Sequence, residues 1–308
     1  MSAPPRVMVL TPQPFLEWRG SPLRVNGTVH ALAELGLTVD LLALPFGQTP
    51  DLPPGVSVHR PPNLFRRASI PIGPSAWKLV YDVLLARLAV RLATRQPYAV
   101  FHGIEEAGWL AVRLARRHGA RAIYEKHSDP VSHRGGAFKN LALHGYARLE
   151  AHMARTADLV IATGPGLARQ VQRLAPAAPV HTIFDVPSSR AEPAPERVAA
   201  LRERFCPDPG QRLAAYAGSF AAYQGLDLLF AAWPEIVRQF PTARALIIGG
   251  SPPEIAARRA TLAAQGLAAS VHFVGPVPPD ELPDYLAAAD VLLSPRGAGV
   301  NTPLKILD

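Results

Sequence analysis

The sequence predicts an α/β protein made of two doubly wound domains. Short apolar runs alternate with helical stretches from Val7 to near the end of the chain. The runs are continuously apolar, which is typical of parallel strands that helices cover on both faces. A polar, proline-rich segment at residues 186–197 (VPSSRAEPAPER) separates two such series. We therefore predict a first domain at residues 1–187 and a second at residues 188–308.

In the first domain, seven apolar runs predict strands. They are Val7–Leu10, Val39–Leu44, Val56–His59, Ala99–His102, Ala122–Glu125, Leu159–Ala162 and Val180–Phe184. Stretches with helical periodicity lie between several of them. These are Asn26–Leu35, Ala76–Thr94, Glu106–His118 and Lys139–Arg155.

The second domain repeats this alternation. Its predicted strands are Leu213–Ala217, Ala245–Ile248, Val271–Val274 and Val291–Leu293, and its predicted helices are Leu226–Gln239 and Asp280–Ala288. We expect the last strand, within Val291–Ser294, to be buried and parallel. Doubly wound domains bind ligands beyond the carboxyl ends of their strands, so site residues are expected there.

Composition limits the class of protein. A single cysteine, Cys206, forms neither an internal disulfide nor a cysteine-rich metal site and favours a reducing compartment. Residues 1–10 do not have the pattern of a secretory signal, and no apolar run approaches the roughly 20 residues that cross a bilayer. The expected location is the cytoplasm, with peripheral contact at the inner face of the membrane as a further expectation.

The net charge of +8 suits anionic partners, although GC-biased codon usage also enriches arginine. Nucleic acid ranks last among these partners, because the chain has no helix-turn-helix, zinc or RNP-type signature. Residues Ala76–Arg91, preceded by Arg66 and Arg67, form a basic amphipathic stretch. This pattern fits docking on a membrane surface or packing on a sheet, and we favour packing.

Two segments of the first domain carry candidate site residues. Gly20 and Ser21 lie where the chain turns into a helix, so their N–H groups can meet a phosphate or a sugar hydroxyl; an ordinary capped helix start is the alternative. The spacing is not the GxGxxG fingerprint. His127 ends a strand beside Glu125, Lys126 and Asp129 and is the candidate catalytic residue. The preceding strand end, His102 to Glu105, supports a site there more weakly.

In the second domain, glycines mark four strand ends. The candidate ligand-binding residues there are Gly218, Ser219, Gln224, Gly225, Gly250, Arg296, Asn301, Thr302, Lys305 and Asp308. The last four follow a glycine-bearing turn, where Thr302 and the following proline form a good helix start. A strand, a glycine turn and a helix N-terminus together favour an anion-binding site.

In their order along the chain, these segments resemble the GT-B-fold glycosyltransferases, specifically the retaining enzymes of glycosyltransferase family 4. The most specific part is AYAGSFAAYQGLDLLFAAW, ARALIIGG, VHFVGPVPPDELPDYLAAADVLLSPR and NTPLKILD. The resemblance implies two Rossmann-like domains, an acceptor-side domain followed by one that binds a nucleotide-diphosphate sugar. It implies transfer of a hexose-like unit to a glycan or lipid-linked acceptor hydroxyl with retention at the anomeric carbon. No metal or cofactor besides the donor is implied.

By position, Gly20 matches the loop glycine that approaches the donor phosphates, and His127 matches the histidine that contacts the transferred sugar. Gly218 and Gly225 match the glycines that flank the family's usual arginine and lysine. Ser219 and Gln224 stand where those two cations belong.

Three further expectations follow from the resemblance. Either Arg296 or Lys305 replaces the missing cations at the diphosphate, or the diphosphate is bound weakly. The first of the family's two acids falls at Val300, while Asp308 takes the place of the second, which holds the ribose. The second domain is expected to be incomplete, because the family continues beyond this motif. The alternatives are a weak or inert nucleotide-sugar-binding remnant and a GT-B-type sugar-nucleotide epimerase, against which the missing acid at position 300 counts.

Overall fold

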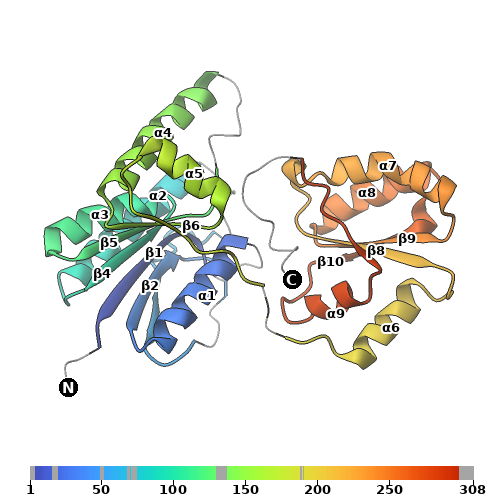
Figure 1. Cartoon of the computed structure of the whole chain (residues 1–308), viewed down its shortest axis with the longest axis horizontal. Coiled ribbons are helices and arrows are strands. Elements are labelled where there is room, and N and C mark those ends of the chain that lie inside the picture. The colour runs from blue at the N-terminus through green and yellow to red at the C-terminus, as the bar shows by residue number, and fades with distance from the viewer. Residues whose placement is uncertain are drawn as a thin grey trace. The chain divides into compact units, whose positions relative to one another are not determined.

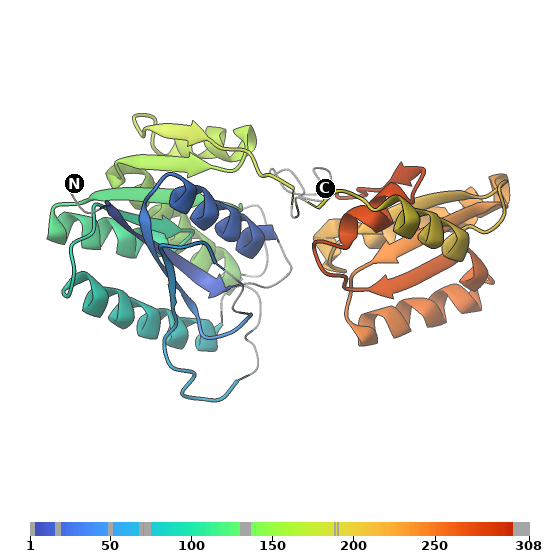
Figure 2. The ribbon, with the colours of Figure 1, turned by 90° about the horizontal axis from the view of Figure 1, so that it is seen from below.

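The computed structural model describes residues 4–15, 20–48, 52–67, 70, 75–129, 137–187, 189 and 191–297. The chain divides into two compact units between Asp185 and Val186. Each unit is a parallel sheet with helices on both faces (Figure 1, Figure 2). No helix in the described ranges is both long and apolar enough to cross a lipid bilayer.

Among the described residues, the first unit holds a seven-stranded parallel sheet. Its strands are β1 (Arg6–Pro14), β2 (Thr38–Leu44), β3 (Val56–His59), β4 (Val100–Ile104), β5 (Arg121–Lys126), β6 (Leu159–Ala162) and β7 (Val180–Thr182). They lie in the order β3-β2-β1-β4-β5-β6-β7. The direction of winding changes between β1 and β4, which is where doubly wound sheets open a ligand crevice.

Right-handed crossovers distribute the helices of this unit over its two faces. The helices are α1 (Gly20–Glu34), α2 (Ala76–Ala93), α3 (Ala107–His118), α4 (Ala137–Thr156) and α5 (Pro165–Leu174). Figure 1 shows α1 on one face and the row α2 to α5 on the other.

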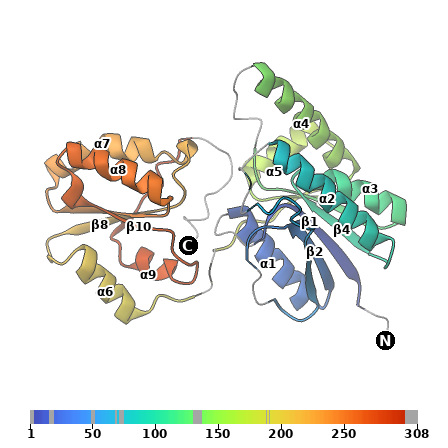
Figure 3. The ribbon, with the colours of Figure 1, turned by 180° about the vertical axis from the view of Figure 1, so that it is seen from behind.

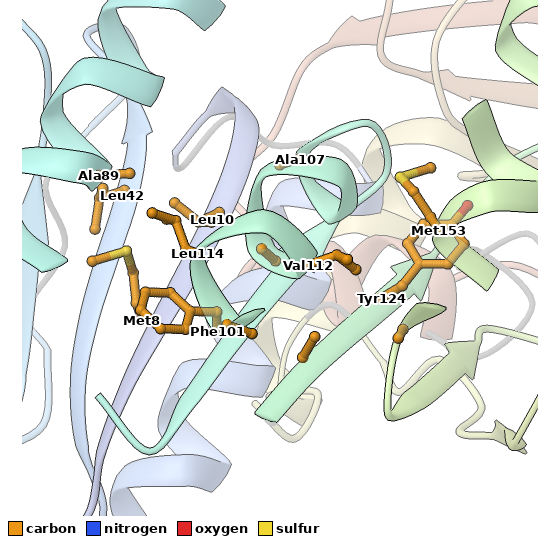
Figure 4. Packing of buried hydrophobic residues seen from close by; sticks show 14 of the residues in the cluster. Met8, Leu10, Leu42, Ala89, Phe101, Ala107, Val112, Leu114, Tyr124 and Met153 are labelled. Carbon is orange, nitrogen blue, oxygen red and sulfur yellow. The ribbon is translucent and has the colours of Figure 1, made fainter. Parts of the chain in front are cut away.

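Alternating side chains of each strand enter two different cores. Val7 and Val9 pack with residues of α1, whereas Met8 and Leu10 pack with residues of α2 and α3. Figure 4 shows part of the second cluster. Because both faces of β1 are fully buried, the strand is apolar at successive positions, which explains the continuous run in the sequence.

The described part of the second unit contains a four-stranded parallel sheet in the order β10-β9-β8-β11. The strands are β8 (Arg212–Ala217), β9 (Ala243–Ile248), β10 (Val271–Gly275) and β11 (Val291–Leu292). The helices are α6 (Pro195–Phe205), α7 (Leu226–Gln239), α8 (Pro252–Ala264) and α9 (Leu282–Ala287), with short 3-10 turns η2 (Ala222–Gln224) and η3 (Ala268–Ser270). Residues of α7 and α8 form the core on one face, and residues of α6 and α9 form it on the other.

Every strand that the sequence predicts is present, but three predictions need correction. The helix predicted from Asn26 begins at Gly20, and the segment predicted as a linker already enters α6 at Pro195. The last strand is parallel to β8 but is not buried, since Val291 is 55% and Leu292 50% exposed. The reason is its place at the edge of the sheet, where β8 is its neighbour in the described residues.

A buried carboxylate stabilises the amino-terminal edge of the first sheet. Asp40 of β2 is 2% exposed, and its oxygens accept hydrogen bonds from Arg6 (2.8 Å), Tyr98 (2.8 Å) and Gln96 (2.9 Å) and lie 2.7 Å from Nε2 of His59. Burial alone raises the pKa of Asp40, but the bonds with His59, Arg6 and Tyr98 outweigh it and hold the pKa below the usual value. The ionised form therefore stabilises the folded state.

We predict that Asp40→Asn lowers the free energy of unfolding at pH 7 by about 2 kcal/mol, because Arg6, Tyr98 and Gln96 lose a charged acceptor in a buried position. The pKa of Asp40 is lower in the folded state than in the unfolded state, so its ionised form adds stability at pH values above the unfolded pKa, near 4. This stability is lost as the pH falls below that value. Urea unfolding at pH 7 and pH 3 should therefore show a smaller difference between wild type and variant at pH 3. Arg121→Gln, which breaks an exposed pair with Asp158, is the control and should cost less than about 1 kcal/mol. An equal effect of both variants would contradict the prediction.

Candidate active site

Buried polar side chains collect at the carboxyl ends of four neighbouring strands of the first unit. They follow or end β1, β4, β5 and β6, and they are Thr11, His102, Glu105, Glu125, Lys126, His127 and Thr163. Each is at most 7% exposed. Polar groups are rarely buried in such number unless they are paired, so their partners define the site.

Glu125, in β5, lies at the centre of this cluster. Its Oε1 accepts a hydrogen bond of 2.6 Å from Nε of Arg24 and lies 3.0 Å from Nε2 of His127. Its Oε2 lies 2.7 Å from Nε2 of His102. Burial alone raises the pKa of Glu125, but His127 and His102 outweigh it and hold the pKa well below the usual range. The carboxylate is therefore ionised, accepts a hydrogen bond from Arg24 and lies within 3.0 Å of a ring nitrogen of each histidine.

The predicted residues Ser21 and His127 are in contact. Gly20 and Ser21 form the first turn of α1, and Oγ of Ser21 lies 2.5 Å from Nδ1 of His127. An ionised carboxylate only accepts, so the ring nitrogen that faces Glu125 carries a proton. In the neutral ring, Nδ1 is then the acceptor for the Ser21 hydroxyl. Both ring nitrogens of His127 thus face groups of this chain.

Arg24 connects this cluster with Ile183, Phe184 and Asp185, which follow β7. It lies one turn beyond Ser21 on α1, and its side chain is 9% exposed. Besides Glu125, its guanidinium donates to the carbonyl oxygens of Ile183 and Phe184 and to Oδ1 of Asp185, all at 3.0 Å. Burial raises the pKa of Asp185, and Arg24 opposes only part of that effect.

Glu105 supports the backbone of His127. Its Oε1 accepts from the backbone N–H of His127 at 3.1 Å and from the Ser128 hydroxyl at 2.8 Å, and its Oε2 accepts from the Tyr146 hydroxyl. Burial raises the pKa of Glu105. Its backbone has φ 51°, a left-handed conformation that is rare outside glycine and is found at functional sites.

A second buried pair lies beside the first. The Lys126 ammonium donates to the Glu150 carboxylate from α4, and both side chains are 1% exposed. Successive residues of β5 point to opposite faces, so Lys126 and Glu125 have different partners. The end of β5 is thereby fixed from α1 on one face and from α4 on the other.

In the second unit, the predicted site residues lie in segments whose backbone packs closely against the backbone of neighbouring segments. The ladder continues one residue beyond the strands, with Gly218 N–H donating to Ile248 O and Gly249 N–H donating to Gly275 O. A Cβ on Gly249 would lie 2.2 Å from Gly218 O, and one on Gly250 would strike the ring of Phe220. These glycines are required for packing of the strand ends.

The loops that follow β8 and β11 meet at Gly225. This residue has φ 74°, and a Cβ there would lie 2.2 Å from Pro295 O. Beside this contact, the Arg296 guanidinium lies 5.5 Å from the centre of the Tyr223 ring. The structure thus brings the predicted residues Gln224, Gly225 and Arg296 together, within one loop cluster.

The remaining predicted residues are placed as follows. Ser219 is exposed, and its carbonyl accepts from the Tyr216 hydroxyl at 2.7 Å, while Gln224 ends η2 and is half-buried. Asn301, Thr302, Lys305 and Asp308 lie outside the described residues, as does Val300.

Sequence reasoning missed Arg24, Asp185 and Glu150. Arg24 fell outside the helix predicted from Asn26, so its spacing of three from Ser21, which puts both on one helix face, was not recognised. Its signal was a basic residue three positions after Ser21, between Leu23 and Val25. Asp185 and Glu150 show no local pattern, because their partners are 161 and 24 residues away.

Comparison with known proteins agrees with the fold and the position of these segments. The family described as "Glycosyl transferase 4-like domain" matches residues 19–184, more than half of the 308 residues, and "Glycosyl transferases group 1" matches residues 211–308. The two units define a glycosyltransferase of the GT-B fold. The chain belongs to the group 1, family 4 glycosyltransferases.

Two curated relatives match parts of the chain. A GDP-mannose-dependent alpha-(1-6)-phosphatidylinositol monomannoside mannosyltransferase of Mycolicibacterium smegmatis is 35% identical over 130 residues, which is 41% of this chain and 33% of the relative. A 2-deoxystreptamine glucosyltransferase of Streptomyces kanamyceticus is 32% identical over 160 residues, which is 52% of this chain and 39% of the relative. The matches therefore span well under half of each relative's length.

Solved structures match over nearly the whole chain. Sucrose-phosphate synthase from Thermosynechococcus elongatus has a TM-score of 0.76 and 20% identity, covering 95% of this chain and 75% of that one. The catalytic domain of starch synthase IV from Arabidopsis thaliana, bound to ADP and acarbose, has a TM-score of 0.71 and 13% identity, covering 99% and 81%. At these identities the likeness concerns the fold.

We predict that Gly225→Ala destabilises the second unit, since the new Cβ would meet the Pro295 carbonyl. Gly266→Ala is a matched control, because Gly266 has φ 71° but nothing within 4 Å of its Cβ position. The left-handed conformation alone costs roughly 1 kcal/mol in each variant, and the clash adds roughly 2 kcal/mol in Gly225→Ala. Thermal melts compare the two, and equal losses of stability would contradict the close approach.

Proposed function

We propose that this protein is a retaining hexosyltransferase, which transfers a sugar from a nucleotide-diphosphate donor to a hydroxyl of a glycan or lipid-linked acceptor. In this reaction the acceptor oxygen forms a bond to the anomeric carbon, and the bond from that carbon to the diphosphate oxygen breaks. The acceptor proton leaves with the nucleoside diphosphate or to solvent. The observation that carries the proposal is the Ser21, His127 and Glu125 cluster in a chain of this family.

His127 is the proposed catalytic residue. Its Nε2 is held by an ionised carboxylate, while the partner of Nδ1 is a small hydroxyl at the start of α1. A sugar hydroxyl can take the place of the Ser21 hydroxyl as the partner of Nδ1. The histidine would then orient the transferred sugar, and its charge could respond to charge that develops during transfer.

We assign the donor to the second unit, residues 188–308, and the acceptor to the first, residues 1–187. The backbone N–H of Ser219, with the side chains of Gln224 and Arg296, would bind the diphosphate, and Gly218 and Gly225 would form the turns that present them. Gly20, at the start of α1, is proposed to contact a phosphate through its backbone N–H. Asp308 and its neighbours Asn301, Thr302 and Lys305 remain proposed contacts of the ribose and phosphate.

A nucleotide-sugar-binding remnant is the second candidate. Ser219 and Gln224 supply neutral groups where charged ones would stabilise the leaving diphosphate. A sugar-nucleotide epimerase remains the third. We expect binding without transfer from a remnant, and a changed donor sugar without an acceptor product from an epimerase.

The test is calorimetric titration with UDP-, GDP- and ADP-sugars, followed by an assay for transfer and for release of nucleoside diphosphate. We expect one donor to bind and to be consumed only when acceptor is present. His127→Ala should lower the rate of transfer at least about 100-fold, because a positioned acid–base or orienting group is lost. His181→Ala, at an exposed histidine of β7 in the same unit, should leave the rate unchanged. Retained turnover in His127→Ala removes His127 from the mechanism.

We also propose that the first unit docks peripherally on an anionic membrane through the outer face of α2. The inner face packs on the sheet through Tyr81, Leu85 and Ala89, as the sequence analysis favours. The outer face is exposed and contains aliphatic and basic side chains. It consists of Ala76, Leu79, Val80, Val83, Arg87, Val90 and Arg91. Figure 3 shows α2 on the outside of the unit.

Charge and exposure support this docking surface. Leu79 is 67% and Val83 45% exposed, and the acidic residue of α2, Asp82, is paired with Lys78 at 2.8 Å. Exposed aliphatic side chains with arginines and no unpaired acid favour the interface of an anionic bilayer. The mycobacterial relative is named for a phosphatidylinositol acceptor, which is consistent with lipid as a substrate here.

We predict that the protein sediments with vesicles of phosphatidylglycerol and not with vesicles of phosphatidylcholine. The double variant Leu79→Ser/Val83→Ser should bind about 10-fold more weakly, since it loses buried apolar area. Arg87→Gln/Arg91→Gln should weaken binding similarly, at about 1 kcal/mol per arginine. Leu228→Ser, at a leucine of α7 that is 64% exposed, is the control. Equal binding to both kinds of vesicle, or binding to neither, would refute this docking.

A further inference from the structure

Helix α1 contributes two side chains to the site from a single face. Ser21 and Arg24 are three residues apart, so they lie on neighbouring turns of the helix and point the same way. Ser21 contacts one nitrogen of the His127 ring, and Arg24 contacts the carboxylate that faces the other. Helix α1 therefore contacts the His127 ring directly through Ser21 and indirectly through Arg24 and Glu125.

We propose that Arg24 and Glu125 are positioning residues that fix the tautomer and orientation of the His127 ring. This inference rests on the proposed role of His127. Arg24 acts through Glu125, and Glu125 acts through His127, so neither is proposed to touch the donor or the acceptor.

The contacts at Glu125 support this role. Nε of Arg24 and Nε2 of His127 approach the same oxygen, at 2.6 Å and 3.0 Å. A buried carboxylate without a fixed cation would be costly, and its two histidines alone carry full charge only when protonated. Arginine is charged at every relevant pH, so Arg24 favours the ionised carboxylate whether or not the histidines are protonated, and an ionised carboxylate can hold a proton on Nε2.

The planar guanidinium also fixes where the carboxylate lies. Arg24 donates simultaneously to Glu125, to two carbonyls and to Asp185, so its own position is set by the segment that follows β7. A lysine has one nitrogen on a flexible stem and cannot reach these acceptors in a fixed fork. The position of the histidine thus depends on backbone at Ile183–Asp185, where the first unit ends.

The test combines ring spectroscopy and kinetics on the full chain. The ¹⁵N signals of the His127 ring are assigned by their loss in His127→Gln, and they distinguish a proton on Nε2 from one on Nδ1. We expect the Nε2–H form in the wild type and a mixture of forms in Glu125→Gln, which keeps the shape of the side chain and removes its charge. Arg24→Lys should show the same mixture.

The kinetic arm separates positioning from donor binding. Arg24→Lys and Glu125→Gln should lower kcat about 10-fold while KM for the donor changes less than about 2-fold, as is typical when the partner of a functional side chain is lost. Arg6→Lys is the matched control, because it alters an Arg–Asp pair at the opposite edge of the same sheet. It should change neither the ring signals nor kcat.

The outcomes are distinguishable. Unchanged ring signals and unchanged kcat in folded Glu125→Gln would overturn the inference, and this isosteric variant decides the matter if Arg24→Lys does not fold. A wild type that transfers no sugar would overturn the proposed function instead. In that case the ring signals still decide whether Arg24 and Glu125 position His127.

Discussion

One buried negative charge determines the arrangement of the first unit's site. Glu125 is 1% exposed, and a charge so far from water must be neutralised by nearby groups. That requirement brings together Arg24 from α1, His102 from β4 and His127 after β5. The same contact fixes α1 on the sheet. If Arg24 moved away, the buried charge of Glu125 would lose its cation, at a large cost in electrostatic free energy. The local fold and the site geometry therefore have the same cause.

The two units present different chemistry at equivalent places. At the strand ends of the first, side chains such as Glu105 and Glu125 are buried and paired. At those of the second, glycines let backbones touch, as at Gly225 and Pro295. Side chains that titrate suit a sugar whose charge changes during transfer, whereas backbone N–H groups suit a diphosphate whose charge is permanent. This difference fits the proposal that the first unit's side chains act on the reacting sugar while the second unit binds the diphosphate.

The sequence predicted the strands well because both sheets are covered on two faces, which requires continuous apolar runs. It placed His127 at a strand end beside Glu125, but it did not predict the contact with Ser21, which lies 106 residues away in another segment. It could not predict the Arg24 contacts, because they depend on segments 101 and 161 residues away. It also missed α5, α6 and α8; α6 and α8 each bury a single residue, Phe205 and Leu262, so they show little apolar periodicity. It placed Val291 in the interior, although β11 lies at the edge of the sheet formed by the described residues.

Because Ser219 and Gln224 are neutral, the proposed transfer depends more strongly on the charged residues of the first unit. A departing diphosphate carries negative charge that backbone N–H groups stabilise only in part, and an arginine contributes more. Arg296 lies in the same loop cluster as Gln224, held against Tyr223, so it is the described cation best placed to replace the family's usual pair. Under the proposed function, one charge would take the place of two, so the sugar would have to be oriented accurately before the bond breaks. A histidine ring fixed through both of its nitrogens supplies that accuracy, and this is the physical reason to connect Arg24 and Glu125 with the rate of transfer.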